Sequence, residues 1–304
     1  MINWRWCKWI GAPADNCPQP AILLKLRSYN HKLTFILKMA DTLLTNVSYD
    51  EKTVSIEYQV IHSDRRDRPL LVFLHEGLGS VAMWKDWPAN LCQLLDCRGL
   101  VFSRYGYGKS TPRPAQEQWA TDFMHIQAQQ FLPAFFSALG IDTRTDQPIL
   151  IGHSDGASIA LLYAAAFPEQ VRATAVLAPH LFVEDATVKN IALARQAYLT
   201  TDLPEKLQRY HDDVDSAFWG WNDVWLSAAF QTWNIEDEVA DIRSPILAIQ
   251  GREDEYGSLA QIEHIAQLAA NVELYVIDDC RHSPHRDKPE QTSDAIVAFV
   301  RALL

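Results

Sequence analysis

A serine stands between two glycines where an apolar run ends, in the segment Gly152-His153-Ser154-Asp155-Gly156. The run before it, residues 149–151, is typical of a buried strand, and small residues with good helix propensity follow. A serine at such a strand-to-helix turn exposes its hydroxyl, and small neighbours two positions away on either side permit the tight backbone. The segment therefore predicts a nucleophile at Ser154. The plain alternative is a serine that only caps the helix.

A serine nucleophile needs a base, and the base needs an acid that orients it. The apolar run 245–249 is followed by a polar loop in which Asp254 lies three residues beyond Gly251. We expect Asp254 to be the acid. The competing acids nearby are Glu253, Glu255 and Asp278.

The candidate base follows the last apolar run, residues 272–277, in a loop that contains two histidines. His282 comes first and is the predicted base, with His285 as the alternative. A polar loop before the final helix would be the ordinary interpretation. A histidine loop that comes after an acid loop and a serine turn is better explained by nucleophilic catalysis.

A fourth requirement is a pair of N–H donors for the oxyanion that forms when the serine attacks. The apolar run 70–74 ends in the glycine-rich turn His75-Glu76-Gly77-Leu78-Gly79, where backbone N–H groups can point into a site. We expect one donor from Gly77 and the other from Asp155, directly after the nucleophile. An ordinary glycine turn is the alternative at the first of these positions.

Buried strands that alternate with helices must hold these residues. Residues 54–60 alternate apolar and polar and predict a half-buried edge strand, and continuous apolar runs predict buried strands at 70–74, 99–103, 148–151, 174–177, 245–249 and 272–277. Helical patterns separate them at 88–95, 122–139, 156–167, 259–269 and 289–303. This alternation predicts an α/β fold with a mostly parallel sheet and helices on both faces.

One stretch interrupts this rhythm, because no buried strand is apparent between residues 179 and 242. The stretch is helical and aromatic, and we interpret residues 181–240 as a cap over the carboxyl ends of the strands, where open α/β sheets bind ligands. Trp219, Trp221 and Trp225 are the candidate substrate-binding residues. Aromatic side chains of this kind also simply pack a cap onto the domain below.

Residues 54–304 resemble the α/β-hydrolase superfamily in four motifs that occur in the right order. They are the nucleophile elbow (152–156), the His-Gly type oxyanion loop (75–79), the G-x-x-D acid turn (251–254), and an H-x-x-H-x-x-x-P-E pattern (282–290). The resemblance implies an α/β-hydrolase fold with a helical cap insertion. It also implies that the first histidine of the last pattern, His282, is catalytic.

Two positions depart from the pattern of that superfamily. Glu76 stands where its relatives usually have glycine after the histidine. The loop after the strand at 99–103 begins with Ser103 and Arg104, where relatives commonly carry an aspartate. An acid at Asp155 is also unusual beside a nucleophile; in the first turn of a helix its side chain can point outward and suit the helix dipole.

Composition narrows the function further. The net charge of −11 argues against nucleic-acid binding, which needs a basic face. The sequence contains no run of eighteen apolar residues, so no membrane span is expected. The five cysteines match no zinc-site spacing and are expected to be free thiols in the cytoplasm. No glycine-rich phosphate motif occurs, and no metal or other cofactor is expected.

The N-terminal residues differ from the rest of the chain. Residues 1–38 contain six basic residues and a single acid, Asp15, and show no regular alternation. We expect residues 1–45 to form an arm that is not part of the natural fold, with Met39 as a candidate natural start. The core is then predicted at 46–180 and 241–304, and residues 1–38 are expected to be dispensable.

Together these features predict a serine hydrolase without a cofactor, most consistent with a carboxylesterase on small esters that carry an apolar acyl or aromatic group. Two alternatives remain open. One is carbon–carbon bond hydrolysis of ring-cleavage diketones, which similar folds perform with the same triad. The other is a ligand receptor that keeps the fold and the triad without turnover.

Overall fold

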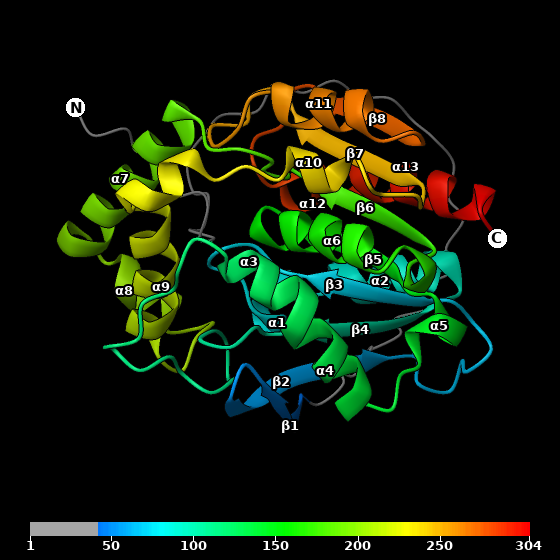
Figure 1. Ribbon diagram of the computed structural model, residues 1–304, viewed down its shortest axis with the longest axis horizontal. Coiled ribbons are helices and arrows are strands. Elements are labelled where there is room, and N and C mark those ends of the chain that lie inside the picture. The colour runs from blue at the N-terminus through cyan, green and yellow to red at the C-terminus, as the bar shows by residue number, and fades with distance from the viewer. Residues whose placement is uncertain (1–41) are drawn as a thin grey trace, which may run out of the picture. The chain divides into compact units, whose positions relative to one another are not determined.

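The computed structural model describes residues 42–304, and the predictions for residues 1–41 lie outside it. Its centre is an eight-stranded sheet in the order β1-β2-β4-β3-β5-β6-β7-β8 (Figure 1). All neighbours from β4 to β8 run parallel, and β2 is antiparallel to both β1 and β4. The strands are β1 Leu43–Tyr49, β2 Lys52–Ile61, β3 Leu70–Leu74, β4 Arg98–Phe102, β5 Ile149–His153, β6 Ala173–Leu177, β7 Ile246–Gly251 and β8 Val272–Ile277.

The edge assignment at the N-terminal end of the sheet was wrong. The predicted edge strand at 54–60 is β2, but β1 pairs with it along its outer side, from Leu43 opposite Tyr58 to Tyr49 opposite Lys52. The predicted start of the core at residue 46 therefore lies inside β1. No sequence signal marked β1, because most of its residues are not buried and it carries no continuous apolar run.

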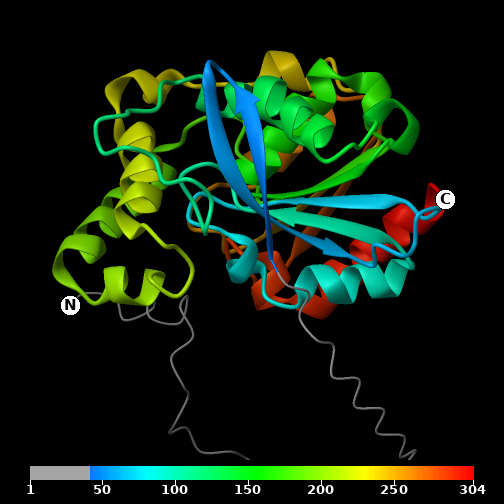
Figure 2. The ribbon, with the colours of Figure 1, turned by 90° about the horizontal axis from the view of Figure 1, so that it is seen from below.

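Helices cover both faces of the sheet, as the alternation of strands and helices predicted. Figure 2 shows α2 and α13 on one face and α4 and α6 on the other. On the first face, Leu91 of α2 and Phe299 of α13 pack into the same apolar cluster as Phe73 of β3 and Ile151 of β5. Because β3, β5 and β6 are buried at every residue, they are mostly apolar rather than alternating.

The helices agree in position with most of the predicted ones. The predicted helix 122–139 is present as α3 and α4, joined by a π-helical stretch (Gln127–Phe131). The core helices are α1 Val81–Trp84, α2 Trp87–Leu95, α3 Phe123–Ile126, α4 Leu132–Ala138, α5 Thr143–Asp146, α6 Asp155–Ala166, α11 Ala260–Leu268, α12 Pro284–Asp287 and α13 Pro289–Ala302. The short helices α1, α5 and α12 were not predicted, because a single turn carries no periodic signal.

Between β6 and β7 the chain forms α7 Asp185–Thr200, α8 Leu203–Leu207, α9 Val214–Leu226 and α10 Glu236–Val239. We call residues 181–240 the cap segment. Its helices α7, α8 and α9 lie beyond one end of the sheet rather than over a face (Figure 1). That end carries the carboxyl termini of the strands, because His211 of the cap segment donates to the Leu78 carbonyl just after β3. No helix within residues 42–304 has the length and apolar character needed to span a bilayer.

Candidate active site

Ser154 occupies a strained turn between β5 and α6. Its φ of 53° lies in the left-handed region, which a residue with a side chain adopts only under strong constraint. Both flanking glycines are required by space: a Cβ on Gly152 would collide with the backbone of Gly156 and Ala157, and one on Gly156 with the Leu74 carbonyl. The turn is anchored by the Ser154 N–H, which donates to the Leu177 carbonyl at 2.9 Å. The hydroxyl is thus held above the sheet at the start of a helix.

The three residues predicted as nucleophile, base and acid meet in one hydrogen-bonded chain. His282 Nε2 lies 2.9 Å from Ser154 Oγ, and His282 Nδ1 lies 2.9 and 3.0 Å from the two carboxylate oxygens of Asp254. The Tyr256 N–H donates to Asp254 Oδ1 at 2.8 Å and fixes the carboxylate. Ser154 and His282 are buried, and so is the side chain of Asp254. This geometry allows His282 to accept the serine proton through Nε2 while Nδ1–H donates to Asp254.

The electrostatics suit that proton transfer. Burial by itself would lower the pKa of His282, but the charge of Asp254 and its hydrogen bond outweigh burial and raise this pKa above its ordinary value. Burial would likewise raise the pKa of Asp254, but His282 and the Tyr256 N–H together bring it below its ordinary value. Asp254 is therefore a charged partner for an imidazolium at neutral pH.

The competing residues have other partners. Glu253 accepts from the Cys280 N–H, Glu255 pairs with Arg281, and Asp278 pairs with Arg252. His285 lies in α12 with its ring 4.7 Å from that of Trp84 and 5.3 Å from that of Trp87. Of the two histidines in this loop, His282 is the one that contacts the serine hydroxyl.

The two predicted oxyanion donors have no backbone acceptor of their own: neither the Gly77 N–H nor the Asp155 N–H donates a backbone hydrogen bond among the described residues. His75 fixes the loop that carries Gly77, since its Nδ1–H donates to the Glu76 carbonyl at 2.7 Å and its Nε2 accepts from the Arg104 N–H at 2.9 Å. Both N–H groups can thus serve an oxyanion without first breaking a bond.

The sequence had suggested that the Asp155 side chain points outward, but it points inward. It is buried, with one oxygen 3.5 Å from an Arg104 nitrogen and the other accepting from Trp225 Nε1–H at 3.1 Å. Burial raises the pKa of Asp155 despite the nearby Arg104 cation. The Arg104 guanidinium also lies 4.8 Å above the Tyr107 ring. The buried Arg104 guanidinium therefore balances the charge of the Asp155 carboxylate.

Glu76, the first departure from the superfamily pattern, is connected through His153 to the loop that carries His282. Its carboxylate is buried, 3.4 Å from His153 Nδ1. His153 Nε2 in turn lies 2.8 Å from the His282 carbonyl, to which its N–H donates. Glu76, at a position where relatives usually have glycine, thus positions His153. His153 in turn holds the backbone of the candidate base, His282.

The second departure, at Ser103, is compensated from another strand. Ser103 Oγ donates to Glu57 Oε2 of β2 at 2.7 Å, and the same oxygen accepts from the Lys109 N–H at 3.0 Å. Glu57 is buried beside Gly108, where a Cβ would strike it. A carboxylate is therefore present at this loop, supplied by the neighbouring strand rather than by the loop itself.

The three cap tryptophans lie in different surroundings. A Cβ on Gly77 would collide with the indole of Trp221, so this ring covers the oxyanion loop. The ring of Trp225 lies 5.0 Å from that of His180 and its N–H binds Asp155. Trp219 packs within the cap segment instead, against Tyr198, and donates to Asp215. Trp221 and Trp225 are thus next to the candidate site, whereas the contacts of Trp219 are with cap residues.

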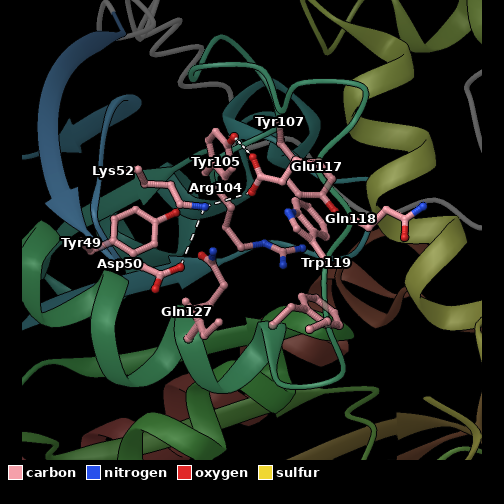
Figure 3. Close-up of a pocket in the computed structure, with 13 residues that line it drawn as sticks. Tyr49, Asp50, Lys52, Arg104, Tyr105, Tyr107, Glu117, Gln118, Trp119 and Gln127 are labelled. Atoms are coloured by element: carbon pink, nitrogen blue, oxygen red, sulfur yellow. Dashed lines mark hydrogen bonds and ion pairs between the residues drawn. The ribbon is translucent and has the colours of Figure 1, made fainter. Parts of the chain in front are cut away.

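A separate cavity of about 220 Å³ is lined in part by Arg104 (Figure 3). It is lined by the β1–β2 turn, the loop that contains Glu117 and Trp119, and the start of α3, and none of the triad candidates lines it. At its centre Lys52 binds Glu117 at 2.9 Å. Arg104 therefore belongs both to this cavity and to the buried pair with Asp155.

Sequence reasoning missed one residue at the nucleophile. His180 Nε2 lies 3.4 Å from Ser154 Oγ, and the side chain is buried. The available signal was the one that identified His282, a histidine a few residues beyond the end of a buried strand. Arg104 and Glu57 were missed as well, because their roles depend on contacts between strands that are distant in sequence.

Comparison with known proteins gives a consistent picture. Residues 71–295 match the model of the alpha/beta hydrolase family. A 2-hydroxymuconate semialdehyde hydrolase from Pseudomonas sp. (strain CF600) is 23% identical over 251 residues, which cover 73% of this chain and 83% of that protein.

Solved structures share the fold at similarly low identity. A carboxylesterase from Bacillus subtilis is 22% identical with a TM-score of 0.63, covering 86% of this chain and 92% of that one. A thermophilic esterase from Thermogutta terrifontis is 17% identical with a TM-score of 0.64, covering 87% of this chain and 99% of that one. These likenesses show the fold.

Proposed function

Because the chain belongs to the alpha/beta hydrolase family, we propose that it is a serine carboxylesterase for small esters with an apolar acyl or aromatic group. The observation that carries the proposal is the hydrogen-bonded chain from Ser154 through His282 to Asp254. A hydroxyl in contact with a buried imidazole, itself oriented by a carboxylate, is the arrangement that activates serine for acyl transfer.

The proposed mechanism uses the same groups in both half-reactions. Ser154 Oγ attacks the ester carbonyl as His282 Nε2 takes its proton, and the carbonyl oxygen gains its charge beside the N–H groups of Gly77 and Asp155. His282 then gives the proton to the leaving alcohol, and an acyl-enzyme remains. Water repeats the sequence, with His282 as base and then as acid. Asp254 keeps Nδ1 protonated and stabilises the imidazolium throughout.

The preference for apolar groups rests on the two tryptophans nearest the site. Trp221 covers Gly77 and Trp225 contacts Asp155, so both indoles border the space beside the candidate oxyanion donors. Ligand sites of this kind are mostly apolar with few polar groups. An acyl chain or aromatic ring would be buried against these indoles, and burial of apolar surface would contribute to binding.

The test is a panel of p-nitrophenyl esters of increasing acyl length, together with aryl acetates. Multiple turnover with kcat/KM highest for one apolar class would support the proposal. An enzyme that binds these esters without releasing more than one p-nitrophenol per chain would instead behave as a receptor, and the proposal would be abandoned.

Carbon–carbon bond hydrolysis is a second candidate, favoured by the likeness to the 2-hydroxymuconate semialdehyde hydrolase. The same serine, base and acid serve that reaction, in which a carbanion rather than an alkoxide leaves. A vinylogous 1,5-diketone belongs in the same substrate panel. Turnover of the diketone with kcat/KM well above that of every ester would replace the esterase proposal by this one.

We also propose a cytoplasmic location, and the support is again the unpaired cysteines. Cys92, Cys97 and Cys280 are free and buried. Unpaired thiols are typical of proteins in reducing compartments.

A further inference from the structure

His180 is a buried histidine that the proposed mechanism does not use. It follows β6 by three residues, and its Nε2 lies 3.4 Å from Ser154 Oγ, on which His282 also acts. Its ring lies 5.0 Å from that of Trp225 and 5.6 Å from that of His282. The nucleophilic oxygen therefore contacts two imidazoles, only one of which is oriented by a carboxylate.

The chain holds this ring in place at some cost. Ala178 has a φ of 49°, a left-handed conformation that is unfavourable for alanine, and it turns the backbone directly before Pro179. Ser158 then clamps His180 on both sides, since its Oγ accepts from the His180 N–H at 3.1 Å and donates to the His180 carbonyl at 2.6 Å. Ser158 lies one helical turn after Ser154, so one turn of α6 positions both the nucleophile and the second histidine.

The protonation of the ring follows from its surroundings. Burial, reinforced by the positive charge that His282 acquires, lowers the pKa of His180 to about 3, so its imidazole is neutral at physiological pH. A neutral ring carries one proton. Nδ1 is buried without a hydrogen-bond partner among the described residues, whereas Nε2 faces Ser154 Oγ. A buried N–H without an acceptor is costly, and the Nε2–H tautomer avoids it.

We propose that His180 is a further catalytic residue, a neutral Nε2–H donor to Ser154 Oγ that stabilises the charge on this oxygen when serine is expelled from the acyl-enzyme. This inference rests on the proposed serine hydrolase function. In deacylation, water adds to the acyl carbon and its proton passes to His282. The bond between the carbon and Oγ then breaks, and the electron pair stays on Oγ. His282 returns the proton to that oxygen, and His180 keeps its own proton throughout.

The role predicts an unequal effect on the two half-reactions. With a p-nitrophenyl ester the leaving group departs easily and little charge builds on Oγ during acylation. In deacylation Oγ is itself the leaving group. His180→Phe, which retains a ring against Trp225, should slow deacylation about 10–100-fold, the range for a hydrogen bond to a charged group. Acylation should slow less, and the acyl-enzyme should accumulate.

The experiment is stopped-flow measurement of the p-nitrophenol burst, with the acyl-enzyme followed by mass spectrometry. His180→Gln retains an N–H donor and should recover part of the deacylation rate. His285→Phe is the matched control, an equally buried histidine that does not contact Ser154; it should change both rates in the same ratio. Equal slowing of both steps in His180→Phe, or deacylation at the wild-type rate, would overturn the inference.

A second readout separates this inference from the proposed function. A fluorophosphonate labels an activated serine whichever ester the enzyme prefers. Labelling requires attack by Ser154 Oγ but not its expulsion, so in His180→Phe and His180→Gln it should slow no more than acylation does. Labelling slowed about 10–100-fold in His180→Phe would mean that His180 assists the attack by Ser154, and would refute its role in serine expulsion even in an enzyme inert towards esters. Labelling of the wild type without ester turnover would count against the carboxylesterase proposal alone.

Discussion

Ser154, His282 and Asp254 form a chain of groups almost wholly removed from water, and this decides how each behaves. A buried imidazole tends to lose its proton and a buried carboxylate tends to gain one. Here each group reverses the tendency of the other, so the pKa of His282 is raised and that of Asp254 is lowered. The pair is thus suited to hold a proton from Ser154, as the proposed function requires.

Replacement of the nucleophile gives the first prediction. Ser154→Ala should lower kcat by about 10⁴–10⁶, because loss of one triad member removes most of the catalysis that the triad provides. The fold should persist, since alanine removes only the hydroxyl. Turnover of a p-nitrophenyl ester and the melting temperature should be measured on the same sample. Near-normal turnover by the purified variant would show that Ser154 is not the nucleophile.

The pH dependence follows from the direction of the His282 pKa shift. His282 must be neutral to act as a base, so kcat/KM should rise with pH as it loses its proton, and its raised pKa places this limb above pH 6.5. In Asp254→Asn the carboxylate is gone while burial remains, so the limb should move to lower pH. The plateau rate should fall by about 10⁴, as when a triad acid is replaced by its amide. A limb that stays in place would mean that another group titrates.

Among the elements, the turn between β5 and α6 has the least room for change. A Cβ on Gly156 would overlap the carbonyls of Leu74 and His75, which begin the oxyanion loop. Gly156→Ala should therefore destabilise the protein by about 1–3 kcal/mol, as overpacking does, and displace both the serine and Gly77. Gly140→Ala is a useful comparison, because a Cβ there meets nothing within 4 Å although φ is 67°. Backbone strain acts only at Gly140, since Gly156 lies in α6 without a positive φ. A Gly156→Ala variant as stable as wild type would therefore mean that the close contact is relieved without cost.

The loop after β4 depends on an acid that belongs to β2. Glu57→Ala would leave Ser103 Oγ and the Lys109 N–H without their buried acceptor. We expect a loss of about 1–3 kcal/mol in the free energy of unfolding for each donor that water does not reach. Glu57→Gln retains an acceptor oxygen and should lose less. Urea unfolding of the two variants measures the difference, and equal stabilities of alanine and glutamine variants would contradict the proposed role.

At the scale of the whole molecule, the cap segment brings Trp221 and Trp225 to the candidate oxyanion donors. Trp221→Ala should shift kcat/KM between short and long acyl esters by roughly tenfold to a few hundredfold, since a buried apolar contact contributes about 1–3 kcal/mol. Acetate turnover should stay measurable. Trp225→Phe serves as a comparison that retains an aromatic ring but removes the N–H bound to Asp155.

The outcome distinguishes substrate binding from simple packing. If Trp221 only holds the cap segment in place, its removal should lower the melting temperature and depress all esters by the same factor. Acyl selectivity would then be unchanged, and the apolar-pocket part of the proposal would fail. Both quantities should be measured on one preparation.

The sequence by itself determined the order of most strands and helices and identified the triad candidates. Continuous apolar runs identify strands covered on both faces, and residues directly after such runs gather at one edge of a parallel sheet. Ser154, Asp254 and His282 could be found in this way because each lies in a short loop after its own strand. The apolar pattern of the strands is sufficient to locate residues that directly follow them.

Only the tertiary structure decided which side chains surround the three triad candidates. Asp155 turns inward because Arg104 and Trp225, distant in sequence, receive it. Glu57 replaces the expected loop acid because β2 runs beside β4, and β1 was missed because an exposed outer strand needs no apolar run. His180 reaches Ser154 through a left-handed Ala178 and a clamp by Ser158. Such contacts depend on the distance between segments that are far apart along the chain, and periodicity carries no information about that distance.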